Sequence, residues 1–250
     1  MPDANPPLLA VAGVAAGYGR TKIITGIDLT VHPGSFTAIL GANGSGRSTL
    51  LRAISGQIPI LAGTIRIAGI DLATAPEHAK RQFGYAVDPA DLPPDLTGQQ
   101  YLELIGSIRG CHPHAWPRDD LITTLQFGPW LRTNISAYSL GTRMKLSLMG
   151  ALLGTPPLLL LDEALNGLDP LILARIRRLL AELCAAGHGL VMSTHMLATI
   201  GTTCTEMIMI ESGRVAHRWT APMIAAAGPA GLETMVVATL EGAVKPSVLF

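Results

Sequence analysis

The sequence has few charged side chains, and lysine is the scarcest of them. Charged residues make up 14% of the 250 residues, against about 25% in average usage, and 18 basic side chains balance 18 acidic ones. Only four of the basic residues are lysines. Because the net charge is zero, a broad basic surface for DNA or RNA is not expected, and we predict no nucleic-acid partner.

Cysteine is also rare, and no targeting or membrane-spanning segment stands out. Cys111, Cys184 and Cys204 are too widely spaced for a disulfide framework or a CxxC metal pair, which fits a reducing compartment. Residues 1–7 lack the basic start and apolar run of a signal peptide. The most apolar stretch, residues 146–161, is interrupted by Gly and Pro and falls short of the roughly 20 apolar residues of a membrane span.

What the sequence has is a large apolar fraction, 48%, arranged as short runs that alternate with helical patterns. This alternation predicts an α/β layered domain. A single apolar stripe after Pro170, ending before Gly187, predicts the clearest helix. The predicted strands span residues 8–14, 24–31, 36–40, 64–67, 83–87, 158–161, 189–193 and 207–210.

The middle of the chain has a different pattern. Strand signals vanish from residue 89 to about 134, and residues 96–109 and 116–127 are predicted as helices. We interpret this as a helical subdomain, about 89–155, inserted into a domain that spans 1–220. The Ala- and Gly-rich tail, 221–250, has no predicted role.

A glycine-rich loop follows the strand 36–40 and precedes a predicted helix. At every position but one it matches the form G-x-x-x-x-G-K-[ST] of a phosphate-binding loop, in which backbone N–H groups and the helix N-terminus face phosphate oxygens. Ser48 would hold Mg²⁺. The predicted nucleotide-binding residues are Gly41, Ala42, Asn43, Gly44, Ser45, Gly46, Arg47, Ser48 and Thr49.

Arg47 is the departure from this pattern, since lysine is expected there. Arginine keeps the positive charge, but its planar fork is longer than the compact ammonium of lysine. Hydrolysis, which depends on positioning, is therefore at more risk than nucleotide binding. The alternative is a glycine-rich turn that binds nothing.

Two carboxylates, Asp162 and Glu163, end a predicted buried strand. Next to the phosphate loop, Asp162 would lie near Mg²⁺, and Glu163 would polarise an attacking water as general base. His195, after the strand 189–193, would sense the γ-phosphate. An ordinary strand end and a surface histidine are the alternatives.

Residues 138–143 precede another predicted helix, whose N-terminus could bind phosphate through Ser139 and the N–H groups near Gly141. The alternative is a serine that only caps the helix.

The order of these motifs resembles that of the ATP-binding subunits of ABC transporters, over residues 8–218. The resemblance implies a P-loop NTPase core with a mostly parallel sheet, an antiparallel β subdomain and a helical insertion. It implies that Tyr18 stacks on adenine and that Asp169 belongs to the D-loop. The implied signature residues are Ser139, Leu140, Gly141 and Thr142.

The resemblance also implies ATP and Mg²⁺ as ligands and a head-to-tail dimer with a second ATP-binding subunit, identical or not. An integral membrane permease would be the other partner, which places the chain peripherally on the cytoplasmic face of the cell membrane. Trp116, Phe127 and Trp130 are candidate anchors for that permease, or part of the subdomain's own core.

Two further departures affect the expected activity. Asp88, a further candidate Mg²⁺ ligand, stands where the family has glutamine, which changes the Mg²⁺ and water contacts that the resemblance implies. The signature lacks the usual Gly-Gly-Gln. We expect an ATP-hydrolysing subunit of an exporter-like transporter. The alternative is an ATP-binding subunit with impaired hydrolysis that gates transport beside an intact sister ATPase.

Overall fold

The computed structural model describes residues 6–111, 118–195 and 204–243. Trp116, one of the candidate anchors, lies outside the described residues.

A six-stranded sheet forms the centre of the molecule, in the order β10-β9-β3-β8-β7-β6. Its strands pair in parallel except β10, which pairs antiparallel with β9. Parallel strands are buried on both faces, and this explains their unbroken apolar runs. The strands are β3 (Phe36–Leu40), β6 (Phe83–Ala86), β7 (Leu158–Asp162), β8 (Gly189–Ser193), β9 (Glu206–Glu211) and β10 (Arg214–Thr220).

A four-stranded antiparallel sheet, ordered β2-β1-β4-β5, packs beside it. The strands are β1 (Leu9–Tyr18), β2 (Thr21–Val31), β4 (Ile60–Ile67) and β5 (Ile70–Asp71). The fold prediction is confirmed, with β5 and β10 as additions. Most of β10 is exposed on at least one face, and its mixture of charged and apolar residues hides the strand signal.

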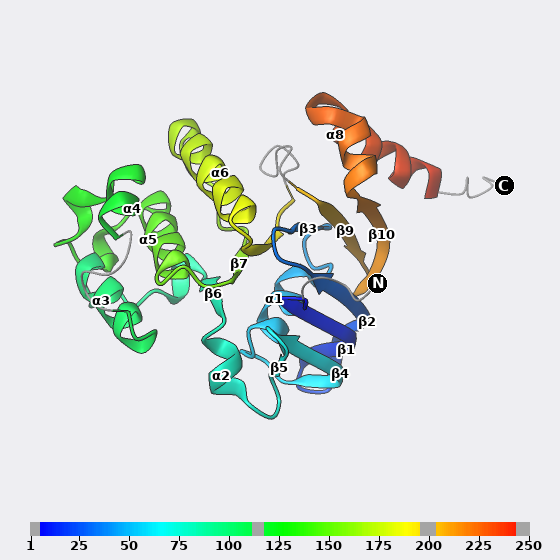
Figure 1. The fold of residues 1–250 in the computed structure, drawn as a ribbon, viewed down its shortest axis with the longest axis horizontal. Helices are drawn as coiled ribbons and strands as arrows, with labels where there is room; N and C mark the ends of the chain where they lie inside the picture. Colours follow the sequence, from blue (N-terminus) through cyan, green and yellow to red (C-terminus); the bar gives the residue numbers. More distant parts are fainter. Residues whose placement is uncertain (1–5, 112–117, 196–203, 244–250) are drawn as a thin grey trace.

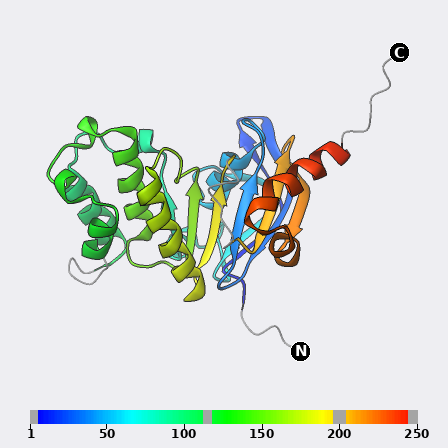
Figure 2. The same cartoon turned by 90° about the horizontal axis from the view of Figure 1, so that it is seen from above.

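The helices fall into groups that Figures 1 and 2 separate clearly. α3, α4 and α5 lie together at one end of the molecule, and α8 lies at the opposite end, beside β10. The α-helices are α1 (Arg47–Ile54), α2 (Pro76–Lys80), α3 (Gly98–Ile108), α4 (Arg118–Thr124), α5 (Leu140–Leu152), α6 (Pro170–Ala185) and α8 (Ala221–Ala243). The 3-10 turns are η1 (Pro89–Asp91), η2 (Gly128–Trp130) and η3 (Ile135–Ala137).

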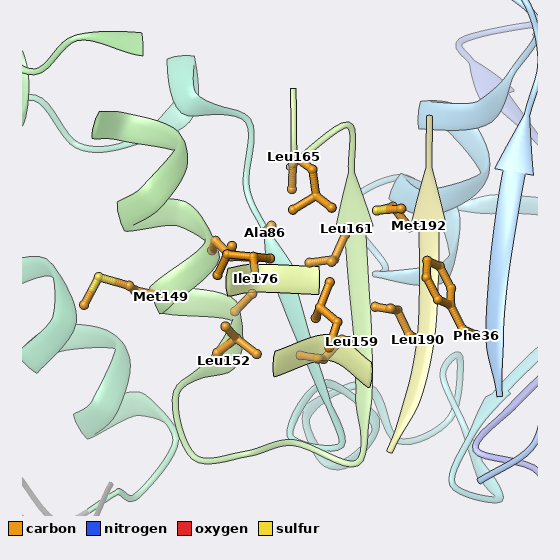
Figure 3. Packing of buried hydrophobic residues seen from close by; sticks show 14 of the residues in the cluster. Phe36, Ala86, Met149, Leu152, Leu159, Leu161, Leu165, Ile176, Leu190 and Met192 are labelled. Atoms are coloured by element: carbon orange, nitrogen blue, oxygen red, sulfur yellow. The ribbon is translucent and has the colours of Figure 1, made fainter. Parts of the chain in front are cut away.

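One apolar core joins the parallel sheet to the helices on one of its faces. Leu161 of β7 and Met192 of β8 are paired neighbours in the sheet, and Leu152 of α5 and Ile176 of α6 belong to the same buried cluster (Figure 3). The apolar stripe predicted for α6 is the side that is buried. This packing fixes the direction of β7, whose end carries the two candidate carboxylates.

The tail after residue 220 is part of this core. α8 contributes Ile224, Leu232 and Val236, all buried, and breaks at Gly228, whose φ is 63°. Part of the predicted tail therefore packs into the folded core. In the described ranges, none of the helices has both the length and the apolar character needed to cross a membrane.

Candidate active site

The phosphate loop lies between β3 and α1 and closes tightly. The Ser45 N–H donates to the Ala42 carbonyl at 3.1 Å, which makes the turn. Gly41 must be glycine, because a Cβ there would lie 2.5 Å from the Ile210 carbonyl oxygen. Gly46, with φ of 112°, directly precedes α1. The loop thus delivers the α1 N-terminus, with its partial positive charge, to the end of the sheet.

Two buried polar atoms of the loop lack a partner among the residues that the structure describes. They are the hydroxyl of Ser45 and the Nε of Arg47. Buried polar groups are nearly always hydrogen-bonded, and an unsatisfied one costs free energy. Together with the helix terminus, these atoms make an environment suited to an anion such as a phosphate.

Arg47 is folded into the site rather than pointing to solvent. Its side chain is 6% exposed, and its Nη1 donates to the Ala42 carbonyl at 3.0 Å. Its Nη2 forms an ion pair with Oε1 of Glu163. The guanidinium fork therefore spans the phosphate loop and the candidate base, a geometry that the single ammonium of lysine does not offer.

Both carboxylate oxygens of Glu163 have partners. Its Oε2 accepts hydrogen bonds from Asn166 Nδ2 at 2.7 Å and lies 3.0 Å from Nδ1 of His195. Its backbone has φ of 48°, a strained conformation for a side-chain-bearing residue, and its N–H donates to the Ser193 carbonyl at 3.2 Å. Both predicted catalytic residues, Glu163 and His195, are therefore in contact. The sequence analysis predicted no contact of Asn166 or Ser193 with Glu163.

Ser48 and Asp162 meet at the same edge, as predicted for a Mg²⁺ site. The Ser48 hydroxyl donates to Oδ1 of Asp162 at 3.2 Å, and Ser193 donates to the same oxygen. Oxygen donors of this kind fit Mg²⁺. No group of three or more His, Cys, Asp or Glu gathers in the described part of the chain, so an ion here would take its remaining ligands from water and phosphate.

Asp88 has a different environment. Its side chain is exposed and accepts the Ala90 N–H at 2.9 Å, which caps η1. Burial is the main reason that the pKa of Tyr85, on the strand before Asp88, rises to about 12. The negative charges of Asp162 and Asp88 raise it further. Asp88 is thus engaged in a turn near the site rather than bonded to Ser48 or Asp162.

Tyr18 lies at the end of β1 with its side chain 46% exposed. Its hydroxyl accepts a hydrogen bond from Nη1 of Arg52 at 3.1 Å, and this bond is the main reason that the pKa of Arg52 is raised. An exposed ring fixed at its hydroxyl is suited to stacking on a base.

The signature residues lie at the start of α5, away from the bonds just described. Ser139 caps the helix by accepting the Thr142 N–H at 3.2 Å, and Leu140 is 62% exposed. Gly141 approaches the backbone at Gly167. Asp169 caps α6 through the Ile172 N–H at 3.0 Å and faces Lys145 at 3.8 Å. Ser139 therefore caps α5, and among the described residues its side chain bonds Thr142 in the first turn of that helix.

Of the candidate anchors, Phe127 is fully buried in the core of the helical subdomain, and Trp130 is 38% exposed. The core interpretation is confirmed for Phe127. Trp130 stays available at the surface.

Comparison with known proteins gives a consistent result. A family model described as ABC transporter matches residues 24–166. The chain is 30% identical over 215 residues to the ABC-type transporter ATP-binding protein EcsA of Bacillus subtilis (strain 168), covering 85% of this chain and 87% of that protein. It is 29% identical over 213 residues to the Nod factor export ATP-binding protein I of Ralstonia nicotianae, covering 84% of this chain and 66% of that protein.

Solved structures agree. The structure of an ATP-binding subunit of an ABC transporter superposes with a TM-score of 0.83 at 29% identity, covering 92% of this chain and 98% of that one. A dimeric structure of a bacterial ABC transporter cassette gives 0.75 at 22% identity, covering 85% and 98%. The second likeness supports the fold.

Proposed function

Because the chain belongs to the ATP-binding subunits of ABC transporters, we propose that it hydrolyses Mg²⁺-ATP at the edge of the parallel sheet and powers a membrane transporter of the exporter type. One observation supports this proposal most directly. Arg47, Ser48, Asp162, Glu163 and His195 come from three separate chain segments. They meet in one hydrogen-bonded network, which Ser193 completes by bonding both Asp162 and the Glu163 N–H.

Nucleotide binding begins at the phosphate loop. The N–H groups of the loop, the α1 N-terminus and the Arg47 guanidinium supply positive potential to the phosphates. Ser48 and Asp162 would hold Mg²⁺, which neutralises charge on the phosphate oxygens when it is bound. The ring of Tyr18 would stack on the adenine.

Hydrolysis requires Glu163 to accept a proton from water, and in this structure its carboxylate is occupied by Arg47. Phosphate oxygens compete with that carboxylate for the guanidinium, since both are anions suited to its fork. Entry of ATP would therefore release Glu163 as it draws Arg47 toward the phosphates. His195, 3.0 Å from Oε2, would then orient the carboxylate.

The signature residues would complete the ATP site of a second copy. Leu140 is exposed, and the Ser139 side chain bonds Thr142 in its own helix turn and no other residue of the described ranges, so this end of α5 is open to a partner. A cassette of similar fold has a dimeric structure, which supports a pair of subunits, identical or not. The head-to-tail arrangement of that pair is part of the proposal.

The membrane partner would be an integral permease that contacts the helical subdomain. Leu104 and Ile108 lie one helical turn apart on α3 and are exposed, as is Trp130 of η2. This would hold the chain peripherally at the cytoplasmic face of the membrane. The Nod factor export relative supports transport outward.

ATP hydrolysis by the purified chain tests this proposal. We expect Mg²⁺-dependent turnover that falls by at least about 100-fold in Glu163→Gln, because the amide cannot accept the proton. Glu182→Gln, an exposed carboxylate on α6, is the matched control and should keep wild-type turnover.

Equal rates for wild type and Glu163→Gln would contradict a role for Glu163 as base. A wild type that binds ATP and shows no turnover would favour the gating alternative instead. Mixing with a sister subunit would then be the next measurement.

A further inference from the structure

Tyr138, the residue before the signature serine, makes two hydrogen bonds to distant backbone. Its side chain is buried, its hydroxyl accepts the Gly98 N–H at 3.1 Å and donates to the Trp130 carbonyl at 2.5 Å. Gly98 begins α3, and Trp130 ends η2. One hydroxyl therefore joins the signature segment to two elements of the helical subdomain.

The ring of Tyr138 is fixed as closely as its hydroxyl. It meets Phe127 edge-on at 5.8 Å between ring centroids, and Trp130 at 6.1 Å. A Cβ on residue 98 would lie 2.4 Å from the Tyr138 hydroxyl oxygen, so the glycine at the start of α3 makes room for this contact.

The elements joined by Tyr138 are tied to each other as well. Thr97 and Gln100 form a capping box at the start of α3. The Gln99 N–H donates to the Leu131 carbonyl, and the Ile135 N–H donates to the Leu96 carbonyl, both at 2.9 Å. We call this unit, residues 96–100 and 127–139, the signature module. Its indole at Trp130 is exposed, and its last residue is Ser139.

A purely apolar packing role would need the ring of Tyr138 and not its hydroxyl. A buried hydroxyl that satisfies one backbone donor and one backbone acceptor fixes the relative position of the segments that own them. Because Ser139 is the next residue in the chain, its position is fixed by the same two bonds.

We propose that Tyr138 is a positioning residue. It holds Ser139 where it can contact the ATP bound to a second copy of the chain, and it couples the position of Ser139 to that of the exposed Trp130. This rests on the proposed function, in which the signature of one copy completes the site of the other.

The first test is Tyr138→Phe, which keeps the ring and removes both hydrogen bonds. We expect kcat for ATP hydrolysis to fall about ten-fold while KM for ATP changes less than about two-fold, because the phosphate loop of each copy is untouched. Tyr101→Phe is the matched control. It removes another buried hydroxyl from the same core and leaves the Gly98 and Trp130 bonds intact, so its kcat should equal wild type.

The second test separates action on the partner copy from a structural defect within one copy. In an equimolar mixture of Tyr138→Phe and Glu163→Gln, half of the dimers are mixed. Each mixed dimer contains one site with intact Glu163 and an intact signature module. We expect about one quarter of the wild-type rate per chain.

A defect confined to its own copy would leave the mixture at about a twentieth of the wild-type rate per chain, and a rate no higher than this would overturn the proposal. A rise in KM for ATP without loss of kcat in Tyr138→Phe would overturn it as well. Failure of the proposed function gives a different pattern. Glu163→Gln alone would then hydrolyse ATP like the wild type.

Discussion

Two polar clusters in this largely apolar chain are held in different ways. One is the signature module; the other, the phosphate edge, consists of Arg47, Ser48, Asp162, Glu163 and His195. At the phosphate edge, charged side chains bind each other: Arg47 pairs with Glu163, and Glu163 also meets His195. In the signature module, the hydroxyl of Tyr138 binds backbone groups. Ion pairs can be exchanged for pairs with an incoming anion, whereas hydroxyl–backbone bonds fix a geometry. The phosphate edge is thus built to rearrange when nucleotide binds, whereas the signature module is built to keep its geometry.

The largest expected effect comes from loosening the signature module at its core. Phe127→Ala removes a fully buried ring that packs on Tyr138. We expect the free energy of unfolding to fall by about 3–5 kcal/mol, since a cavity replaces the ring. Denaturant unfolding measures this. Trp130→Ala, at a partly exposed ring, should cost far less, and an equal cost would show that the module is not packed as described.

A second prediction breaks the phosphate edge at its metal position. Asp162→Asn should lower Mg²⁺-dependent turnover about 100-fold, because the amide binds Mg²⁺ poorly and also weakens the partners Ser48 and Ser193. Asp88→Asn should change turnover less than about three-fold, since that carboxylate caps η1. Turnover measured against Mg²⁺ concentration compares the two, and equal losses would place Asp88 at the metal.

A third prediction concerns the other end of the nucleotide. Tyr18→Ala should weaken ATP binding about ten-fold, because base–aromatic stacking is worth about 1–3 kcal/mol. Tyr18→Phe keeps the ring and loses only the bond from Arg52, so its affinity should stay within about two-fold of wild type. Calorimetric titration in the Glu163→Gln background measures both without turnover. Weakening by Phe as strong as by Ala would show that the ring itself is not the contact.

The smallest effect on ATPase activity is expected at Cys204, which lies just before β9 and beside Phe36 at the start of β3. Burial raises the pKa of the Cys204 thiol to about 12, so at pH 8.5 it stays protonated in the folded chain. Because the folded pKa lies above that of the unfolded thiol, the stability from this group is full below about pH 9 and is lost as the pH rises further. Iodoacetamide should therefore label Cys204 only after unfolding, without prior loss of ATPase activity. Labelling of the native chain at the rate of Cys111 would contradict this.

The phosphate edge could be predicted from the sequence because its motifs are local. The glycines of residues 41–46 indicate a phosphate-binding turn, and the carboxylates at the end of β7 indicate a candidate metal and base site, each within a few residues. The order of parallel strands then brings Asp162 beside Ser193. The role of Ser193 itself was not predictable, since a serine at the end of a strand has no signal until its neighbour strand is known.

The signature module escaped prediction for the opposite reason. Tyr138 lies 40 residues from Gly98, and nothing in the spacing of these residues indicates that a hydroxyl joins them. The tail was also missed, because an Ala- and Gly-rich composition gives little periodicity even though Leu232 and Val236 are buried on one side of α8. Contacts that depend on tertiary packing leave no local pattern.

The measurement that tests the central claim most directly is ATP turnover by Arg47→Lys. In the proposed mechanism, Arg47 restrains Glu163 through an ion pair that nucleotide must open. Lysine is shorter and offers one ammonium in place of two separate guanidinium nitrogens, so it should hold Glu163 less firmly. Turnover should therefore rise about five-fold while KM for ATP stays within about two-fold of wild type. A fall in turnover would contradict the account and would show that Arg47 itself supplies what lysine provides in other phosphate loops.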